Sequence, residues 1–262
     1  MTAPVSVDDW EQNGYLAVPG VLSSAEVDRL RTSADKLVAM GAHLTASDPR
    51  FKLETFDGAP TPGAVQQIGE PHELAGEWLD LARHPGLLDI VEALLGRNIS
   101  LYYSMFMLKP ALRGAAAPWH QDLAFYQHER ARLIGCQVYI DDSTEQNGCL
   151  KVVPGSHREG LYNHFDGDTF ATRVVGDTTG FDERAVALPM AAGGAVFWHC
   201  MTLHSSSANT SPSARRAMTL EYRDPATTLM GGAFTAGLEV RSVGLMLRGE
   251  DPTGRMMPGV VR

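Results

Sequence analysis

The stretch Pro118-Trp119-His120-Gln121-Asp122 decides how the rest of this sequence is interpreted. His120 and Asp122 are two residues apart, so on an extended backbone their side chains point to the same face. A second histidine brought alongside would complete a face of two histidines and one carboxylate. That ligand set is typical of non-haem Fe(II) oxygenases.

The composition excludes several other classes of protein. Of the 262 residues, 44% are hydrophobic, which is ample for a packed core, and the formal net charge is −9. An acidic chain lacks the basic face of a nucleic-acid or membrane-surface binder. We therefore expect a small-molecule substrate, no nucleic acid and no membrane partner, and leave the oligomeric state open. Three widely spaced cysteines and a short acidic start without an apolar signal region favour free thiols in the cytoplasm.

The first 97 residues predict mostly helical support and a loop. Apolar residues recur at helical spacing in four segments, at 6–14, 23–40, 71–82 and 85–96. A short strand is expected at 15–18. Residues 41–64 contain three prolines and little periodicity, so they are interpreted as a long loop, a common place for lids.

From residue 99 the hydrophobic period changes to two. The expected strands cover 99–109, 133–140, 149–153, 185–188, 195–203 and 216–222, with one more possible at 238–245. Residues 156–184 look like a second excursion over the surface. The pattern predicts one domain, mainly β with flanking helices: support at 1–97, a barrel or sandwich core at 98–224, and a C-terminal extension at 225–262.

His204 is the best candidate for the third metal ligand. It ends a predicted strand, and Arg215 begins the next one after a Ser-rich turn. His199 is the alternative, but its odd spacing from His204 would turn it to the opposite face of a straight strand. Two imidazoles and one carboxylate leave three positions on Fe(II), for a bidentate 2-oxo acid and O2. If that acid is 2-oxoglutarate, an arginine is the natural partner of its far carboxylate, and the buried charges then cancel.

Four segments make the chain resemble the phytanoyl-CoA dioxygenase family of Fe(II)- and 2-oxoglutarate-dependent oxygenases. They are SMFMLKP at 104–110, WHQD at 119–122, NGCL at 147–150 with VPGSH at 153–157, and HSS at 204–206 through RR at 215–216. The resemblance implies a double-stranded β-helix (jelly-roll, cupin-like) core. It also implies a set of site residues: His120, Asp122 and His204 on iron, Arg215 rather than Arg216 on 2-oxoglutarate, and Ser206 and Met105 lining the cosubstrate site.

Further contacts are less specific. Gln137 lies beside Val138, where the family often has an aromatic residue. Ala64 stands where some members carry a basic residue that contacts the cosubstrate, and Gln66 or Gln67 is expected to substitute for it. For Lys109, a surface role and a pocket role are both open. The candidates for the substrate pocket are Trp119, Tyr126 and Tyr103, for which core packing is an equal alternative.

The expected activity is oxidation, most simply hydroxylation, of a small molecule, as in bacterial secondary-metabolite tailoring. Asp122 argues against halogenation, because related halogenases replace this carboxylate with a small residue to make room for halide. Epimerisation, desaturation and oxidative cyclisation use the same oxidising chemistry and stay open. A non-catalytic metal-binding jelly roll is the alternative from a different class.

Overall fold

The computed structural model describes residues 6–231 and 244–257 of the chain. The N-terminal part supplies most of the helices and the strands at both edges of the major sheet. Its elements are α1 (Val7–Asn13), β1 (Tyr15–Val18), α2 (Ser24–Gly41), β2 (Phe51–Phe56), β3 (Ala59–Gly69), the 3-10 turn η1 (Pro71–Glu73), α3 (Gly76–Ala82) and α4 (Pro85–Leu95).

The remaining elements are mostly strands. They are β4 (Ile99–Lys109), β5 (Ala117–His120), η2 (Asp122–Ala124), β6 (Gln127–His128), β7 (Leu133–Tyr139), β8 (Leu150–Val152), η3 (Ser156–Arg158), β9 (Phe165–Asp166), β10 (Thr169–Phe170), α5 (Thr179–Arg184), β11 (Val186–Leu188), β12 (Ala195–His199), β13 (His204–Ser206), β14 (Arg215–Arg223), β15 (Leu229–Gly231) and β16 (Leu245–Arg248).

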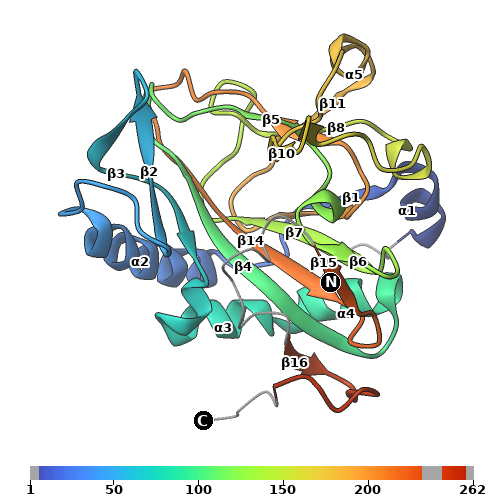
Figure 1. Ribbon diagram of the computed structural model, residues 1–262. Coiled ribbons are helices and arrows are strands. Elements are labelled where there is room, and N and C mark those ends of the chain that lie inside the picture. Colours follow the sequence, from blue (N-terminus) through green and yellow to red (C-terminus); the bar gives the residue numbers. More distant parts are fainter. Residues whose placement is uncertain (1–5, 232–243, 258–262) are drawn as a thin grey trace.

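Two antiparallel sheets form the core (Figure 1). The major sheet has the order β1-β12-β7-β14-β4-β3-β2, with β16 also paired to β4, and the minor sheet has the order β11-β8-β13-β5. Apart from the pair β2–β3, strands that are neighbours in these sheets are separated in the sequence by other elements, which is the connectivity of a jelly roll. The predicted double-stranded β-helix core is confirmed.

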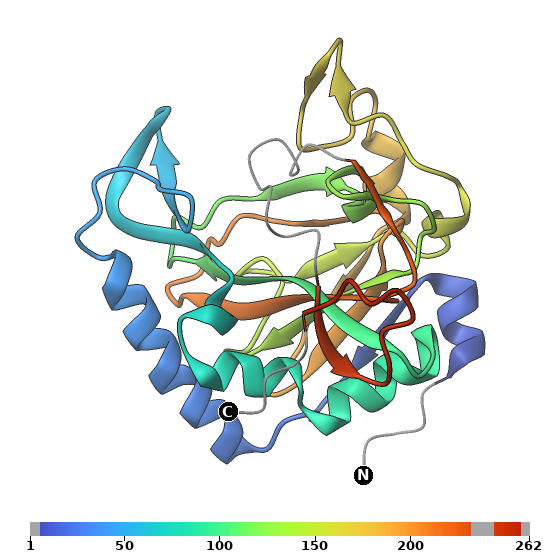
Figure 2. The ribbon, with the colours of Figure 1, turned by 60° about the horizontal axis from the view of Figure 1, so that its bottom comes forward.

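The two faces of the major sheet differ in chemistry because successive side chains alternate. On the outer face, residues such as Phe106 of β4 and Leu220 of β14 belong to the main apolar core. Helices α2, α3 and α4 cover this face, as Figure 2 shows. The inner face, opposite the minor sheet, carries polar residues that include Arg215 and Gln137. The sheet thus presents its polar face to the space between the two sheets.

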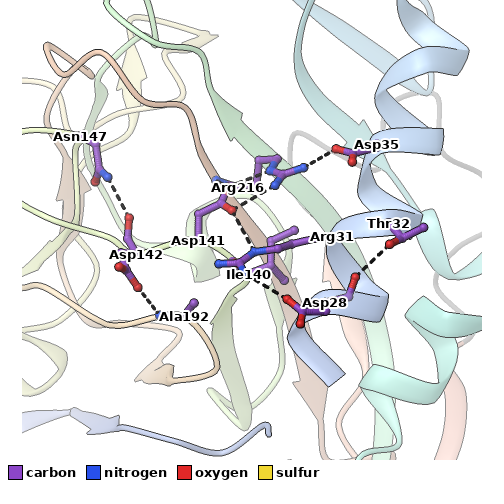
Figure 3. Close-up of polar contacts among 10 residues, drawn as sticks. All are labelled: Asp28, Arg31, Thr32, Asp35, Ile140, Asp141, Asp142, Asn147, Ala192 and Arg216. Atoms are coloured by element: carbon purple, nitrogen blue, oxygen red, sulfur yellow. Dashed lines mark hydrogen bonds and ion pairs between the residues drawn. The ribbon is translucent and has the colours of Figure 1, made fainter. Parts of the chain in front are cut away.

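Helix α2 is held to the sheet by ion pairs as well as by apolar packing (Figure 3). Arg216 of β14 makes a bidentate contact with Asp141, at 2.7 and 3.0 Å, and a 2.7 Å contact with Asp35 of α2. Arg31 of α2 donates to the carbonyl oxygen of Ile140 at 2.8 Å. Arg216 is therefore committed to the outer face of the sheet.

Two of the predicted elements are wrong. The first is the loop expected at 41–64, of which residues 51–64 form β2 and the first part of β3. These two strands make a hairpin whose turn residues, Asp57 and Gly58, have φ of 49° and 79°. Positive φ at both central residues is what an Asp-Gly hairpin turn requires, so the signal was present. The strand expected at 195–203 ends at His199, and a turn at 200–203 leads into β13.

Two hairpins rise on opposite sides of the core, β2–β3 and β9–β10 (Figure 2). The second belongs to the excursion predicted at 156–184. Of the strand expected at 238–245, residues 238–243 lie outside the described residues, and β16 begins at Leu245. Within 6–231 and 244–257, no helix has the length and apolar character needed to cross a membrane.

Candidate metal and cosubstrate site

Three side chains from neighbouring segments converge between the two sheets. His120 of β5 and His204 of β13 are directly opposite each other across the strand pair, and Asp122 begins the η2 turn just beyond β5. Asp122 Oδ1 lies 3.5 Å from His204 Nε2 and 3.9 Å from His120 Nε2. One ligand atom from each residue falls within 4.8 Å of the others, so the three can hold one metal ion.

Hydrogen bonds orient both imidazoles for coordination. The Nδ1 of His120 lies 2.8 Å from the Pro118 carbonyl oxygen, and the Nδ1 of His204 lies 2.9 Å from that of Thr202. Each Nδ1 therefore carries the proton, and each Nε2 offers a lone pair to the site. Burial lowers the pKa of His120 well below its ordinary value, and the neighbouring His204 adds to this effect. Neutral imidazole is the form that binds a metal.

Trp198 holds the carboxylate, a role that the sequence did not suggest. Its indole Nε1 donates to Asp122 Oδ2 at 2.6 Å, which leaves Oδ1 facing the imidazoles. Gly135, across the strand pair from Trp198, makes room for the indole, because a Cβ there would come within 2.3 Å of the ring. Burial raises the pKa of Asp122, while His204 and the indole N–H oppose the shift. A bound cation would favour the carboxylate form.

Gln121, between the two ligands, ties their strand to a distant loop. Its amide nitrogen donates to the carbonyl oxygens of Gly160 and Met201 at 2.8 and 2.7 Å, and its backbone N–H donates to His164 Nε2 at 3.1 Å. His164 begins a second His-x-Asp, His164-Phe165-Asp166. Asp166 is exposed, so this second motif supplies a support for the site rather than a ligand pair.

Arg215 is a buried cation without a carboxylate partner among the described residues. It is 2% exposed, its Nη2 donates to the Gly148 carbonyl oxygen at 3.0 Å, and its Nη1 lies 3.4 Å from Gln137 Oε1. Its Nε has no hydrogen-bond partner, and the Tyr139 ring lies beneath the guanidinium at 5.8 Å. Burial lowers the pKa of Arg215. A buried guanidinium with a free donor favours an anionic ligand.

The other predicted cosubstrate residues are not equally placed. Thr219, four residues after Arg215 on β14, pairs with Met105 on one side and with Gln137 on the other, which puts all three on the inner face. Ser206, two residues after His204, is buried on β13. Gln66 instead donates to Glu54 at 3.1 Å.

Lys109 lies in the interior and not on the surface. It is directly opposite Arg215 across the β4–β14 pair, and its Nζ donates to the carbonyl oxygens of Ala115 and Ser207, the latter at 2.9 Å. Burial and the nearby Arg215 lower the pKa of Lys109 to about 7, and Glu54 opposes the shift. Lys109 therefore joins the segment before β5 to the turn after β13.

The three substrate-pocket candidates occupy different surroundings. Trp119 packs in an apolar cluster with Phe181, and its indole donates to Asp182 at 3.2 Å. The hydroxyl of Tyr103 lies next to Gly69. Tyr126 is buried, and its hydroxyl donates to the carboxyl group of Glu221.

Glu221 is a further interior group, on the same face of β14 as Arg215. It is 1% exposed, and its Oε2 has no hydrogen-bond partner. Burial raises the pKa of Glu221 well above its ordinary value, and nearby Asp122 adds to the effect. Burial thus favours the neutral form of this carboxyl group. Its position six residues after Arg215, an even spacing on one strand, is the signal that could have identified it as inward-facing.

Comparison with known proteins identifies the family. The phytanoyl-CoA dioxygenase (PhyH) family model matches residues 10–217. The chain belongs to this family. L-proline trans-4-hydroxylase from Streptomyces griseoviridis is 29% identical over 237 residues, which cover 80% of this chain and 82% of the relative.

Two solved structures extend the comparison. A non-heme alpha-ketoglutarate-dependent carbocyclase from nogalamycin biosynthesis matches with a TM-score of 0.73 and 25% identity, over 93% of this chain and 92% of that chain. EctD from S. alaskensis, solved with 2-oxoglutarate and 5-hydroxyectoine, matches with a TM-score of 0.70 and 26% identity, over 87% of this chain and 79% of that one. The predicted class, an Fe(II)- and 2-oxoglutarate-dependent dioxygenase, is confirmed.

The site fits the cofactors of the family. Two neutral imidazole nitrogens and one carboxylate oxygen are the donor set of a non-haem Fe(II) centre. The unpartnered Nε of Arg215 fits the distal carboxylate of 2-oxoglutarate.

Proposed function

We propose that this protein hydroxylates a small organic molecule, using Fe(II) held by His120, Asp122 and His204. The observation that carries the proposal is the pairing of this convergent site with a buried arginine that has no anionic partner within residues 6–231 and 244–257. A purely structural metal site would not require a buried cation without an anionic partner in the same interior. A 2-oxoglutarate dianion, by contrast, balances both the iron and Arg215.

When bound, the iron supplies the activation of O2 that couples decarboxylation of 2-oxoglutarate to oxidation of a C–H bond. The protein's residues hold the reactants in place. Arg215 binds and orients the distal carboxylate of the cosubstrate, with Ser206, Met105 and Gln137 beside it. Trp198 fixes the Asp122 carboxylate by its indole hydrogen bond. Gln66 acts indirectly: it donates to Glu54, and Glu54 accepts a hydrogen bond from the Ala115 backbone N–H in the segment before β5.

Hydroxylation is the simplest outcome, and retention of Asp122 argues against halogenation. The carbocyclase relative supports oxidative cyclisation as the second candidate, and epimerisation and desaturation need only a different substrate placement. Relatives named for proline hydroxylation and for nogalamycin biosynthesis support a small-molecule substrate of bacterial secondary metabolism. Tyr126 and Tyr103 flank the interior in which such a substrate would lie.

Coupled turnover tests this proposal. Purified protein is supplied with Fe(II), ascorbate and 2-oxoglutarate, and succinate is measured with and without a panel of candidate substrates. We expect a basal rate that rises with the true substrate and is abolished in His120→Ala. Absence of any succinate, together with tight metal binding, would instead support a non-catalytic metal-binding jelly roll.

A further inference from the structure

A chain of aromatic rings runs outward from one of the metal-site residues. The ring of Phe125 contacts that of His120 edge-on, with centroids 5.5 Å apart. Phe170 contacts Phe125 at 4.9 Å, and Phe165 contacts Phe170 at 5.5 Å. These three contacts are close to T-shaped, and the His164 ring stacks on Phe170 with centroids 6.4 Å apart. The rings are continuous from the site to the surface.

This row of aromatic rings begins at His120, the metal-site residue whose side chain is most exposed to solvent. The His120 side chain is 18% exposed, whereas those of His204 and Asp122 are 5% and 8% exposed. His120 is thus the most exposed of the three metal-site residues, and the Phe125 ring lies against it. Phe125 and Phe170 are half-buried, and Phe165 at the outer end is 40% exposed. The outer end of this row of rings is therefore partly open to solvent.

The hairpin that carries two of these rings ends at a strained residue. After β9–β10, the Ala171 N–H closes the hairpin on the His164 carbonyl oxygen at 2.8 Å. Thr172 follows with a φ of 56°, a conformation that a β-branched residue rarely adopts. The chain is then anchored by the Val174 N–H on the Trp119 carbonyl oxygen at 2.8 Å. Such strain persists where surrounding contacts impose a conformation, and it is frequent at ligand clamps.

We propose that Phe125, Phe170 and Phe165 form a substrate-recognition wall for a flat apolar ring system. This inference rests on the proposed function, since it takes the metal site as the reacting centre. Ring faces and edges in sequence offer stacking and T-shaped contacts that a planar aromatic group can use and a puckered aliphatic group cannot use equally. The substrate would thus present a planar ring along the hairpin and place the bond to be oxidised near His120.

Fragment binding beside a paramagnetic metal tests this wall. The protein is loaded with Mn(II), and naphthol is compared with decahydronaphthol, which has the same carbon skeleton without flat rings. Broadening of the probe's proton signals reports binding close to the metal, and naphthol fluorescence reports binding to the metal-free protein. The variants are Phe170→Ala, Phe165→Ala and, as a matched control, Leu161→Ala, which removes an apolar side chain on the same excursion that is 44% exposed.

We expect naphthol to bind at least several-fold more tightly than decahydronaphthol, with strong broadening. Phe170→Ala should weaken naphthol binding about tenfold, which corresponds to about 1.4 kcal/mol. Phe165→Ala, which removes a ring that is 40% exposed, should weaken it about threefold, or about 0.7 kcal/mol. Leu161→Ala should match the wild type. Equal binding of the two probes, or full affinity in both phenylalanine variants, would overturn the wall. Failure of Mn(II) itself to bind would contradict the proposed function, while fluorescence still decides the wall.

Discussion

Replacing Arg215 with methionine should have opposite effects on ligand binding and on the stability of the free protein. The guanidinium is 2% exposed and has an unpartnered Nε, so the ligand-free protein carries the cost of an unpaired buried cation. Methionine removes that cost but leaves the Gly148 carbonyl oxygen without its 3.0 Å donor. These changes offset each other, so the unfolding free energy should stay within about 1 kcal/mol of the wild type or rise.

The effect on 2-oxoglutarate should be far larger. Breaking a buried ion pair from one side costs about 3–5 kcal/mol, because the other charge is left uncompensated. At about 1.4 kcal/mol per tenfold, the affinity for 2-oxoglutarate should fall by roughly two to three and a half orders of magnitude. In the wild type, cosubstrate at 100 times its Kd stabilises the fold by about 2.7 kcal/mol. That stabilisation should vanish in Arg215→Met at the same concentration.

The assay is denaturant unfolding of Mn(II)-loaded protein with and without 2-oxoglutarate, supported by calorimetric titration. Arg216→Met is the matched control, because its partners Asp141 and Asp35 lie on the outer face. It should lower the unfolding free energy by about 1–3 kcal/mol through loss of the bidentate contact and leave 2-oxoglutarate affinity unchanged. If Arg215→Met binds 2-oxoglutarate within threefold of the wild type, the assignment of Arg215 is refuted.

Three further predictions concern the supports of the site and the buried histidines. Trp198→Phe removes the 2.6 Å hydrogen bond to Asp122, so it should weaken metal binding by about 10- to 100-fold. Titration with Co(II) measures this affinity, and an unchanged affinity would contradict the role of Trp198. Gly135→Ala drives a Cβ against the Trp198 ring and should cost about 1–3 kcal/mol in denaturant unfolding, with weaker Co(II) binding; wild-type behaviour in both would contradict the packing. Burial lowers the pKa of His199 and of His128 to about 4 in the folded protein, whereas both histidines have a pKa near 6.5 in the unfolded chain. As the pH falls, the unfolded chain therefore binds protons at these histidines before the folded protein does. Their contribution to stability is complete above about pH 6.5 and should be lost as the pH falls towards 4, by up to about 1.4 kcal/mol per pH unit for each histidine. Replacing His199 with glutamine should reduce the dependence of the unfolding free energy on pH, measured by urea unfolding.

Much of the core could be predicted from alternation alone. The expected strand at 99–109 matches β4 because its apolar residues fill one face of a half-buried sheet. The hairpin β2–β3 was missed because its prolines and weak periodicity outweighed the Asp57-Gly58 turn signal. The strand expected at 195–203 was too long because the residues of the turn at 200–203 are also mostly apolar, so the sequence pattern does not mark the end of the strand.

The residues of the site, too, differ in how far the sequence could predict them. His120, Asp122 and His204 lie within reach of one metal ion, and their order and spacing in the sequence indicated them. Arg215 is buried on the inner face of the major sheet, and its role toward 2-oxoglutarate stays a prediction. Trp198 could not be found in this way, because its role depends on contacts across strands with residues distant in the chain. Alternation locates a residue on a face, but only tertiary contacts show what it bonds there.

The most direct test of the central claim is the absorption of the Fe(II)–2-oxoglutarate chelate under anaerobic conditions. Bidentate binding of a 2-oxo acid to Fe(II) produces a charge-transfer band in the visible region, and no turnover is needed to see it. We predict that the wild type develops this band on addition of Fe(II) and 2-oxoglutarate, and that His120→Ala and His204→Ala do not. Absence of the band in the wild type, or a band of full intensity in His204→Ala, would contradict the account.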